Sequence, residues 1–75
     1  MELQKFVQLF SEQFEDSENV EFTSETIFKE IEEWDSLTAL TIIAMVDEEL
    51  EKRITGADIR NCNTIEDLHK LIMLI

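Results

Sequence analysis

The side chains that could do chemistry in this chain are serine hydroxyls, a single thiol, a single imidazole and many carboxylates. Nucleophilic catalysis by Ser36 would need a base within hydrogen-bond reach, and His69 is the only histidine. The sequence implies no third group that would orient His69, so we expect it at the edge of the core, satisfied by a carbonyl or by water. Cys62 lies in a short polar loop with no neighbouring base, which predicts a small buried side chain rather than an activated thiol.

The carboxylates are abundant, and their surroundings favour solvation over catalysis. The chain has 18 acidic residues and no evident cleft, so an exposed surface explains paired carboxylates better than acid–base chemistry does. The acids between Glu15 and Glu21 lack the mid-loop glycine and the closing glutamate of an EF-hand, which predicts a solvated charge run. A single cysteine excludes an internal disulfide and every multi-cysteine metal motif. We therefore expect neither a metal site nor an enzyme.

Ser36 stands out because of the helix that must position it. The stretch from Leu37 to Arg53 has no Gly or Pro and is rich in strong helix formers, which predicts one helix of about five turns. Asp35 is the natural N-cap, because its carboxylate can accept hydrogen bonds from the free backbone N–H groups of the first turn. Ser36 then falls in that turn, where its hydroxyl can face solvent.

The motif Asp35-Ser36-Leu37, at the start of an acidic helix in a chain of 75 residues, resembles an acyl carrier protein. In that family the serine hydroxyl is esterified to 4′-phosphopantetheine, whose terminal thiol holds an acyl group as a thioester. The resemblance covers essentially the whole chain. Ile54 closes the long helix, and residues 58–59 and 64–68 resemble the third and fourth helices of the family.

The resemblance implies a role for each residue of the motif. Ser36 would carry the phosphopantetheine, and Asp35 and Leu37 would complete the modification motif, with Asp35 serving the metal site of the phosphopantetheinyl transferase. The protein would shuttle acyl groups between enzymes of fatty-acid, lipid or specialised polyketide-type biosynthesis and would do no chemistry itself. An acidic helical interaction module without a prosthetic group remains the alternative.

Two departures from the family pattern bear on the pathway. Trp34 stands where most members have a small residue, usually glycine, and Thr38 and Thr41 stand where the fatty-acid type usually has acids. In these features the chain resembles a stand-alone carrier of a specialised pathway more than the housekeeping carrier of fatty-acid synthesis. Use as a peptidyl or aminoacyl carrier stays open, although the glycines that usually precede the serine in those carriers are absent.

Two apolar stripes run along the predicted long helix. The first is enough to face the core and consists of Ala39, Ile42, Ile43, Val46 and Leu50. The second lies roughly 150° away around the helix. With its polar rim we call it the docking stripe, and it comprises Leu37, Leu40, Thr41, Ala44, Asp47, Glu48 and Glu51. We expect it to bind partner enzymes, namely the transferase and acyl-transferring or acyl-modifying enzymes; the alternative is that the bundle buries both stripes.

The charge balance predicts which partners are excluded. With 18 acidic and 6 basic residues the net charge is −12, which repels nucleic acid and anionic lipid and favours partners with basic surfaces. The N-terminus lacks the pattern of a signal peptide, and the longest apolar run, Leu71 to Ile75, is far too short to span a bilayer. We expect a cytoplasmic monomer that does not insert into membranes.

The predicted fold class is all-α: a small four-helix bundle of three main helices and one short helix, forming one domain over residues 1–75. The first helix runs from Glu2 to Phe14, and its apolar face consists of Leu3, Phe6, Val7, Phe10 and Phe14. Leu9 lies off that face and is expected at the surface. A long loop follows, with a short turn around Thr26 to Ile31. The apolar residues expected to pin it to the core are Val20, Phe22, Ile27, Phe28, Ile31 and Trp34.

The C-terminal part is predicted from its turn and capping signals. Gly56, the only glycine, is expected to form the turn that ends the long helix. A short helix follows from Asp58 to Asn61. Residues 64–67 form a capping box that opens the last helix, whose apolar face consists of Ile65, Leu68, Ile72 and Ile75. The helical faces suggest a lining for an acyl chain made of Ile43, Val46, Ile59, Cys62, Leu68 and Ile72.

Overall fold

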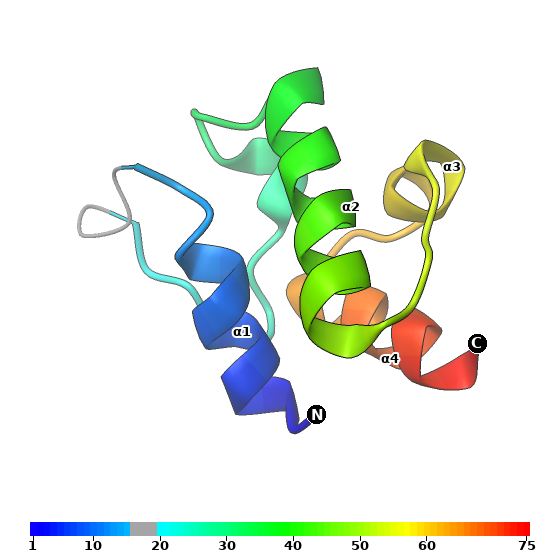
Figure 1. The fold of residues 1–75 in the computed structure, drawn as a ribbon. Coiled ribbons are helices and arrows are strands. Elements are labelled where there is room, and N and C mark those ends of the chain that lie inside the picture. The colour runs from blue at the N-terminus through cyan, green and yellow to red at the C-terminus, as the bar shows by residue number, and fades with distance from the viewer. Residues whose placement is uncertain (16–19) are drawn as a thin grey trace.

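The computed structural model describes residues 1–15 and 20–75, and this part forms a small all-α bundle of four α-helices and one 3₁₀ turn (Figure 1). The predicted fold class is confirmed. The elements are α1 (Leu3–Ser11), η2 (Phe28–Glu30), α2 (Ser36–Leu50), α3 (Gly56–Arg60) and α4 (Ile65–Leu74). None of the helices in the described residues is long and apolar enough to cross a membrane.

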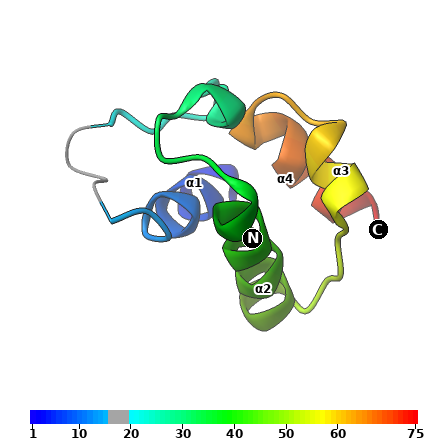
Figure 2. The same ribbon diagram turned by 90° about the horizontal axis from the view of Figure 1, so that it is seen from above.

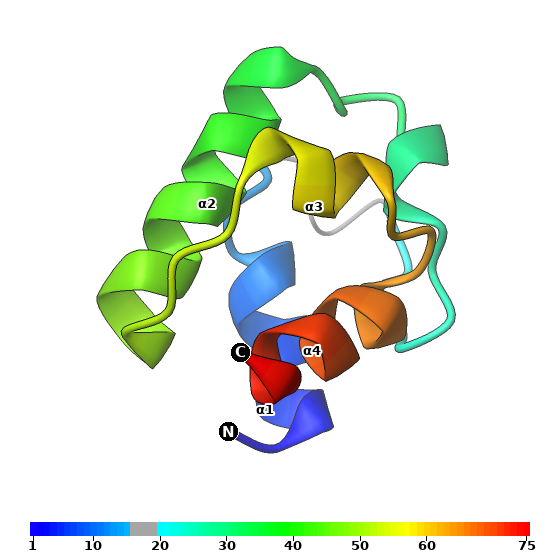
Figure 3. The same ribbon diagram turned by 90° about the vertical axis from the view of Figure 1, so that its right-hand side faces the viewer.

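The helices pack as two linked pairs. α1 packs against α4, α2 packs against α3, and α3 also contacts α4. Figure 3 shows the short α3 beside α2, with α4 below it. The 3₁₀ turn lies next to the beginning of α4, where Ile27 and Thr64 form an isolated antiparallel bridge (Figure 2). The long connection between α1 and α2 is therefore tied to the C-terminal half of the bundle.

The core is apolar and rich in aromatic rings. Among the described residues no polar or charged side chain is buried, and the buried set is Phe6, Phe10, Phe14, Phe28, Ile42, Met45, Val46, Ile54, Ile59, Cys62, Ile65, Leu68 and Ile72. Five rings of α1 and the following connection surround Phe10 at centroid distances of 5.6 to 6.4 Å. Large rings let a chain of this size bury enough apolar area to fold.

α1 is shorter than predicted. It ends at Ser11. The next two hydrogen bonds, from Gln13 to Phe10 and from Phe14 to Ser11, span three residues, as in a 3₁₀ turn, and not four as in an α-helix. Phe14 still reaches the core and is only 6% exposed. The surface position predicted for Leu9 is wrong, since this side chain is half-buried and packs against the core.

The connection before α2 is held to the core largely as predicted. Phe28 is completely buried, and Phe22, Ile31 and Trp34 pack against the core as half-buried side chains. Two predicted residues are exceptions: Ile27 is 43% exposed, with its backbone bridged to Thr64, and Val20 is half-buried but not among the side chains packed against the core. The predicted charge run over residues 15–21 includes residues 16–19, which lie outside the described residues.

The end of α2 differs from the prediction. The helix ends at Leu50 rather than at Arg53, because Glu51 adopts a left-handed conformation with φ 57° and ψ 35°. A left-handed residue ends a helix most readily when it is glycine, yet here a glutamate does so. The chain then extends, so that Ile54 enters the core at 4% exposure instead of closing the helix.

Gly56 therefore has a different position from the one predicted. It is the first residue of α3, not the turn that ends α2, and its φ is not positive. α3 begins two residues earlier than expected because Thr55 and Asp58 form a capping box, with backbone-to-side-chain distances of 2.9 and 3.2 Å. The short helix ends at Arg60.

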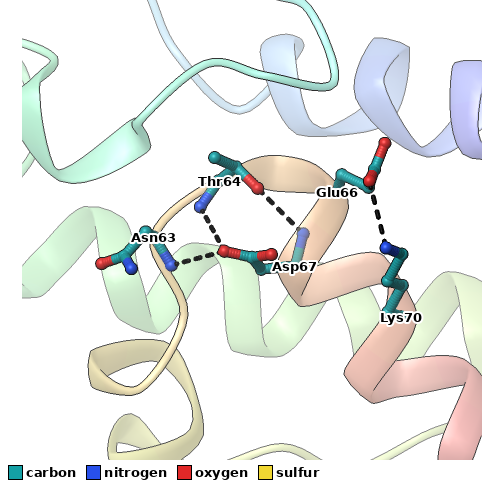
Figure 4. A network of polar contacts seen from close by, with 5 residues as sticks. All are labelled: Asn63, Thr64, Glu66, Asp67 and Lys70. Carbon is teal, nitrogen blue, oxygen red and sulfur yellow. Dashed lines mark hydrogen bonds and ion pairs between the residues drawn. The ribbon is translucent and has the colours of Figure 1, made fainter.

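The capping box predicted for α4 is confirmed (Figure 4). The hydroxyl of Thr64 accepts a hydrogen bond from the N–H of Asp67 at 3.0 Å, and the Asp67 carboxylate accepts from the N–H groups of Thr64 and Asn63 at 3.1 and 3.2 Å. Three of the four residues predicted for the apolar face are buried. The fourth, Ile75, is 52% exposed, because the helix stops at Leu74 before that side chain can join the face.

Candidate functional site

The start of α2 presents a serine hydroxyl to solvent. Ser36 is the first residue of the helix and is exposed. Asp35 precedes it as an extended N-cap, and its Oδ1 accepts hydrogen bonds from the N–H of Thr38 at 2.8 Å and from the Thr38 hydroxyl at 2.9 Å. Within the described residues the Ser36 hydroxyl makes no hydrogen bond, so it remains available to a reagent.

The hydrogen bonds of the N-cap stabilise the negative charge of Asp35. Hydrogen bonds from the backbone and hydroxyl of Thr38, with a smaller one from the N–H of Leu37, hold the pKa of Asp35 below its ordinary value. The carboxylate is therefore ionised at neutral pH. It satisfies one of the free N–H groups at the positive end of the helix dipole and confirms the N-cap predicted from the sequence.

Trp34 anchors the residues that lead into the helix. Its ring lies 4.9 Å from that of Phe28 and is stacked on Phe10 and Phe14, each at 6.4 Å between centroids. Its backbone N–H donates to the carbonyl of Ile31 at 2.9 Å. The residue two positions before the serine is thus held by the aromatic core.

A groove of about 760 Å³ opens beside Ser36, between α2, α3 and η2. We call it the Ser36 groove. Its apolar lining comes from three parts of the chain and comprises Trp34, Ala39, Leu40, Ile43 and Ile59. The charged residues of the lining are two cations, Lys29 of η2 and Arg60 of α3, and the carboxylate of Asp35. Such a groove can hold an apolar group that is attached to the neighbouring hydroxyl.

The lining predicted for an acyl chain is only partly brought together. Ile43 and Ile59 do line the Ser36 groove. The other four predicted residues, Val46, Cys62, Leu68 and Ile72, do not line it and belong to the buried core. Helical periodicity cannot separate a groove wall from the core behind it, and no signal in the sequence singled out Lys29 or Arg60.

The docking stripe lies on the surface. Leu37 and Leu40 are 70% and 62% exposed, and the other members of the stripe are also exposed. The alternative, in which the bundle buries both stripes of α2, is therefore wrong. The first stripe does face the core, with Ile42 and Val46 completely buried. Met45, which was not predicted to belong to this stripe, is also buried, at 5% exposure.

The other residues that could do chemistry, His69 and Cys62, lie in surroundings that suit a structural role. The Nε2 of His69 lies 2.8 Å from the carbonyl oxygen of Met1, and its ring is 5.5 Å from that of Phe6, as expected for a histidine at the edge of the core. Cys62 is 4% exposed, and burial raises the pKa of its thiol, so the reactive thiolate is disfavoured. In the part of the chain that the structure describes, no cluster of three or more potential metal ligands occurs.

The start of α2 fits a phosphate ester on its serine. The first turn has free backbone N–H groups, and no acidic residue follows the cap within that turn. The charge of Asp35 opposes a second anion nearby, but its carboxylate is directed at the N–H of Thr38. The exposed hydroxyl and the adjoining groove leave room for a long substituent.

Comparison with known proteins agrees with this geometry. A family model described as a phosphopantetheine attachment site matches residues 4–72. Members of that family carry 4′-phosphopantetheine covalently on a serine. No curated protein and no solved structure gives a match to this chain.

Proposed function

This chain belongs to the phosphopantetheine attachment family, and from that premise we propose that Ser36 is the residue that carries the arm. The observation that supports this assignment most directly is that Ser36 is exposed at the first position of a helix, directly after the aspartate that caps it. The other serines in the described residues, Ser11 and Ser24, lack both features. The carrier role of the chain follows from its family. The assignment of Ser36 as the attachment site is our proposal.

The modification is a phosphoryl transfer from coenzyme A. The Ser36 oxygen forms a bond to the phosphorus of the pantetheine phosphate, the pyrophosphate bond of coenzyme A breaks, the adenosine bisphosphate leaves and the hydroxyl proton is released. The arm supplies a terminal thiol that holds an acyl group as a thioester. The side chains at the start of α2 orient the Ser36 hydroxyl and expose it to the transferase, and the transferase catalyses the reaction.

Three groups of this chain would assist the modification. The Asp35 cap holds the first turn of α2 in place, so that the Ser36 hydroxyl is presented from a rigid backbone. Free N–H groups and the positive end of the helix dipole stabilise the phosphodiester once it is attached. By the family resemblance, Asp35 also serves the metal site of the transferase.

The docking stripe is the proposed contact surface for partner enzymes. Exposed leucines beside Ser36 offer apolar anchors, and a net charge of −12 favours basic partner surfaces. We propose a single carrier domain over residues 1–75, monomeric and cytoplasmic, without catalytic activity of its own. Its cargo would be an acyl group of fatty-acid, lipid or polyketide-type biosynthesis, and a peptidyl or aminoacyl cargo is the second candidate.

Intact-mass measurement tests the assignment of Ser36. Incubation with coenzyme A and a phosphopantetheinyl transferase should add the mass of one phosphopantetheine to the wild-type chain. Ser36→Ala should abolish that gain while leaving the helical circular dichroism unchanged, because Asp35 still caps α2. Ser24→Ala is the matched control and should still gain the mass. A gain in Ser36→Ala would overturn the assignment, and no gain in the wild type would favour an acidic interaction module without a prosthetic group.

A further inference from the structure

The Ser36 groove combines apolar walls with two cations, Lys29 and Arg60, and one carboxylate, Asp35. The chain has six lysine and arginine residues against 18 acids, yet Lys29 and Arg60 both line this groove. A groove that only had to shelter a hydrocarbon would gain nothing from cations in its lining, because apolar contact is non-directional and charge-free. The pairing of cations with an apolar wall points to a ligand that is apolar along its length and negative at one point.

Separate contacts hold these two cations at the groove. The Nζ atom of Lys29, on η2, donates a hydrogen bond to the backbone carbonyl oxygen of Arg60 at 2.5 Å. The Nζ atom also lies 5.9 Å from the centroid of the Phe28 ring, an arrangement that a cation favours. Lys29 is therefore held at the C-terminal end of α3, which packs beside α2 (Figure 3).

Gly56 leaves room for the second cation. A Cβ atom at this position would lie 3.3 Å from Nη1 of Arg60, closer than such contacts normally are. The side chain of Arg60 thus folds back along α3 over the only glycine of the chain. Since Gly56 has no positive φ to explain its presence, this close approach is the structural feature that its missing side chain accommodates.

Asp35 is the acid that lines the same groove, and its carboxylate accepts hydrogen bonds from Thr38. Among the described residues the ion pair within 4 Å joins Lys70 to Glu66, at 3.2 Å on the surface of α4. In that part of the chain neither Lys29 nor Arg60 has a carboxylate at ion-pair distance. Both cations therefore keep hydrogen-bond donors for an anion that enters the groove.

We propose that Lys29 and Arg60 bind a carboxylate on the acyl cargo, so that the Ser36 groove prefers a carboxyacyl group to a neutral acyl group of equal length. This inference rests on the proposed attachment of the arm to Ser36. The acyl chain would lie against Ala39, Ile43 and Ile59, and its carboxylate would meet the two cations. A flexible arm can fold back so that its end reaches the groove beside its own attachment point.

The phosphodiester of the arm is the other anion near this groove, and the contacts favour the cargo. The hydrogen bonds that hold Asp35, next to Ser36, come from Thr38 and not from a cation. The ammonium of Lys29 is hydrogen-bonded to the backbone carbonyl of Arg60, at the C-terminal end of α3. The positive charge therefore lies toward α3 and not at the start of α2, where a phosphate on Ser36 would begin.

The test compares three loaded forms of the protein. A transferase that accepts acyl-coenzyme A would install an unacylated arm, a glutaryl arm or a pentanoyl arm, the last two being equal in chain length. Intact mass first establishes that each form carries its group. Amide spectra then report whether Ile43, Ile59 and Arg60 sense the cargo. The glutaryl form should shift these amides furthest, and an exposed ion pair should raise groove occupancy over the pentanoyl form by roughly two- to five-fold.

Matched variants assign the effect to the two cations. Lys29→Gln and Arg60→Gln should each reduce the preference for glutaryl, and Lys29→Arg, which keeps the charge, should retain it. Lys5→Gln and Arg53→Gln make the same charge changes at exposed positions outside the groove and should leave the preference unaltered.

Each contrary outcome has a distinct meaning. Wild-type protein that gains no mass overturns both the assignment of Ser36 and this inference. Loaded protein whose groove amides respond equally to glutaryl and pentanoyl overturns the carboxylate preference alone. Amides that already shift fully with the unacylated arm would identify the phosphodiester as the bound anion, which also overturns it.

Discussion

The indole ring of Trp34 lies stacked on the ring of Phe10, with 4° between the two planes and 6.4 Å between their centroids. This contact joins the residue just before the Asp35 cap to Phe10, which is completely buried near the C-terminal end of α1. It gives a structural reason for a large side chain where most family members have a small one. The aromatic core sets the position from which α2 begins.

Removal of the Trp34 ring should therefore destabilise the fold. Trp34→Ala should reduce the free energy of unfolding by about 3 kcal/mol, the lower end for a large aromatic side chain, since Trp34 is only half-buried. Urea unfolding measures this change. Trp34→Phe keeps a ring against Phe10 and should lose much less. Equal losses in the two variants would mean that stacking does not hold this segment.

The Asp35 cap should contribute to helix stability independently of the serine. Asp35→Ala should lower the melting temperature by roughly 4–8 °C, because the N–H of Thr38 loses its acceptor. Asp35→Asn keeps an acceptor oxygen and should lose less. Ser36→Ala is the control and should melt like the wild type, and a drop in that variant would show that the hydroxyl has a structural role.

The leucines of the docking stripe should matter for binding and not for folding. Leu37→Ala and Leu40→Ala should each change the free energy of unfolding by less than about 0.5 kcal/mol, because both side chains are exposed. Ile42→Ala, on the buried side of the same helix, should lose about 2–5 kcal/mol. If Leu37 anchors a partner, its truncation should weaken that complex by ~1–3 kcal/mol, measured by titration calorimetry.

The acidic rim of the docking stripe should act on the rate of encounter. Glu48→Lys should slow association with a basic partner and reduce the salt dependence of that rate, because rim charges steer approach. Stopped-flow mixing measures both quantities. Glu49→Lys makes the same charge change outside the stripe and should have a smaller effect. Equal effects of the two variants would attribute steering to net charge alone.

Salt should stabilise the free protein. Eighteen acids against six basic residues repel one another across a small surface, and salt beyond about 0.1 M screens this repulsion over distances above about 10 Å. The melting temperature should rise along a sodium chloride series, and a divalent cation should be more effective at equal concentration. A melting temperature that stays flat or falls would show that self-repulsion does not limit stability.

The capping box of α4 should make part of the stability depend on acid pH. Backbone hydrogen bonds from Thr64 and Asn63 hold the pKa of Asp67 below its ordinary value of 3.8. A lowered folded-state pKa contributes stability that is present above 3.8 and is lost as the pH falls through the folded value. In Asp67→Asn, the free energy of unfolding measured with urea should therefore fall less over that acid range than it does in the wild type. Glu49→Gln, which removes an exposed charge, is the control and should keep the wild-type loss.

What the sequence determined about this protein is chiefly local. The starts of α2 and α4 follow from Asp35 and from the Thr64–Asp67 capping box, because a cap is formed by residues within one turn of each other. The exposed face of α2 follows from helical periodicity in the same way. The candidate serine could therefore be found without a fold.

Only the tertiary structure decided the ends of the helices and the composition of the groove. α2 ends at Leu50, where the left-handed Glu51 turns the chain so that Ile54 enters the core, and the local pattern contains no stop signal before Gly56 that would predict this end. Lys29 and Arg60 lie 31 positions apart, and the packing of η2 against α3, where the Lys29 ammonium donates to the backbone carbonyl of Arg60, makes both residues line one groove. Packing sets such distances, so the charge of the Ser36 groove is a property of the folded chain and not of any single segment.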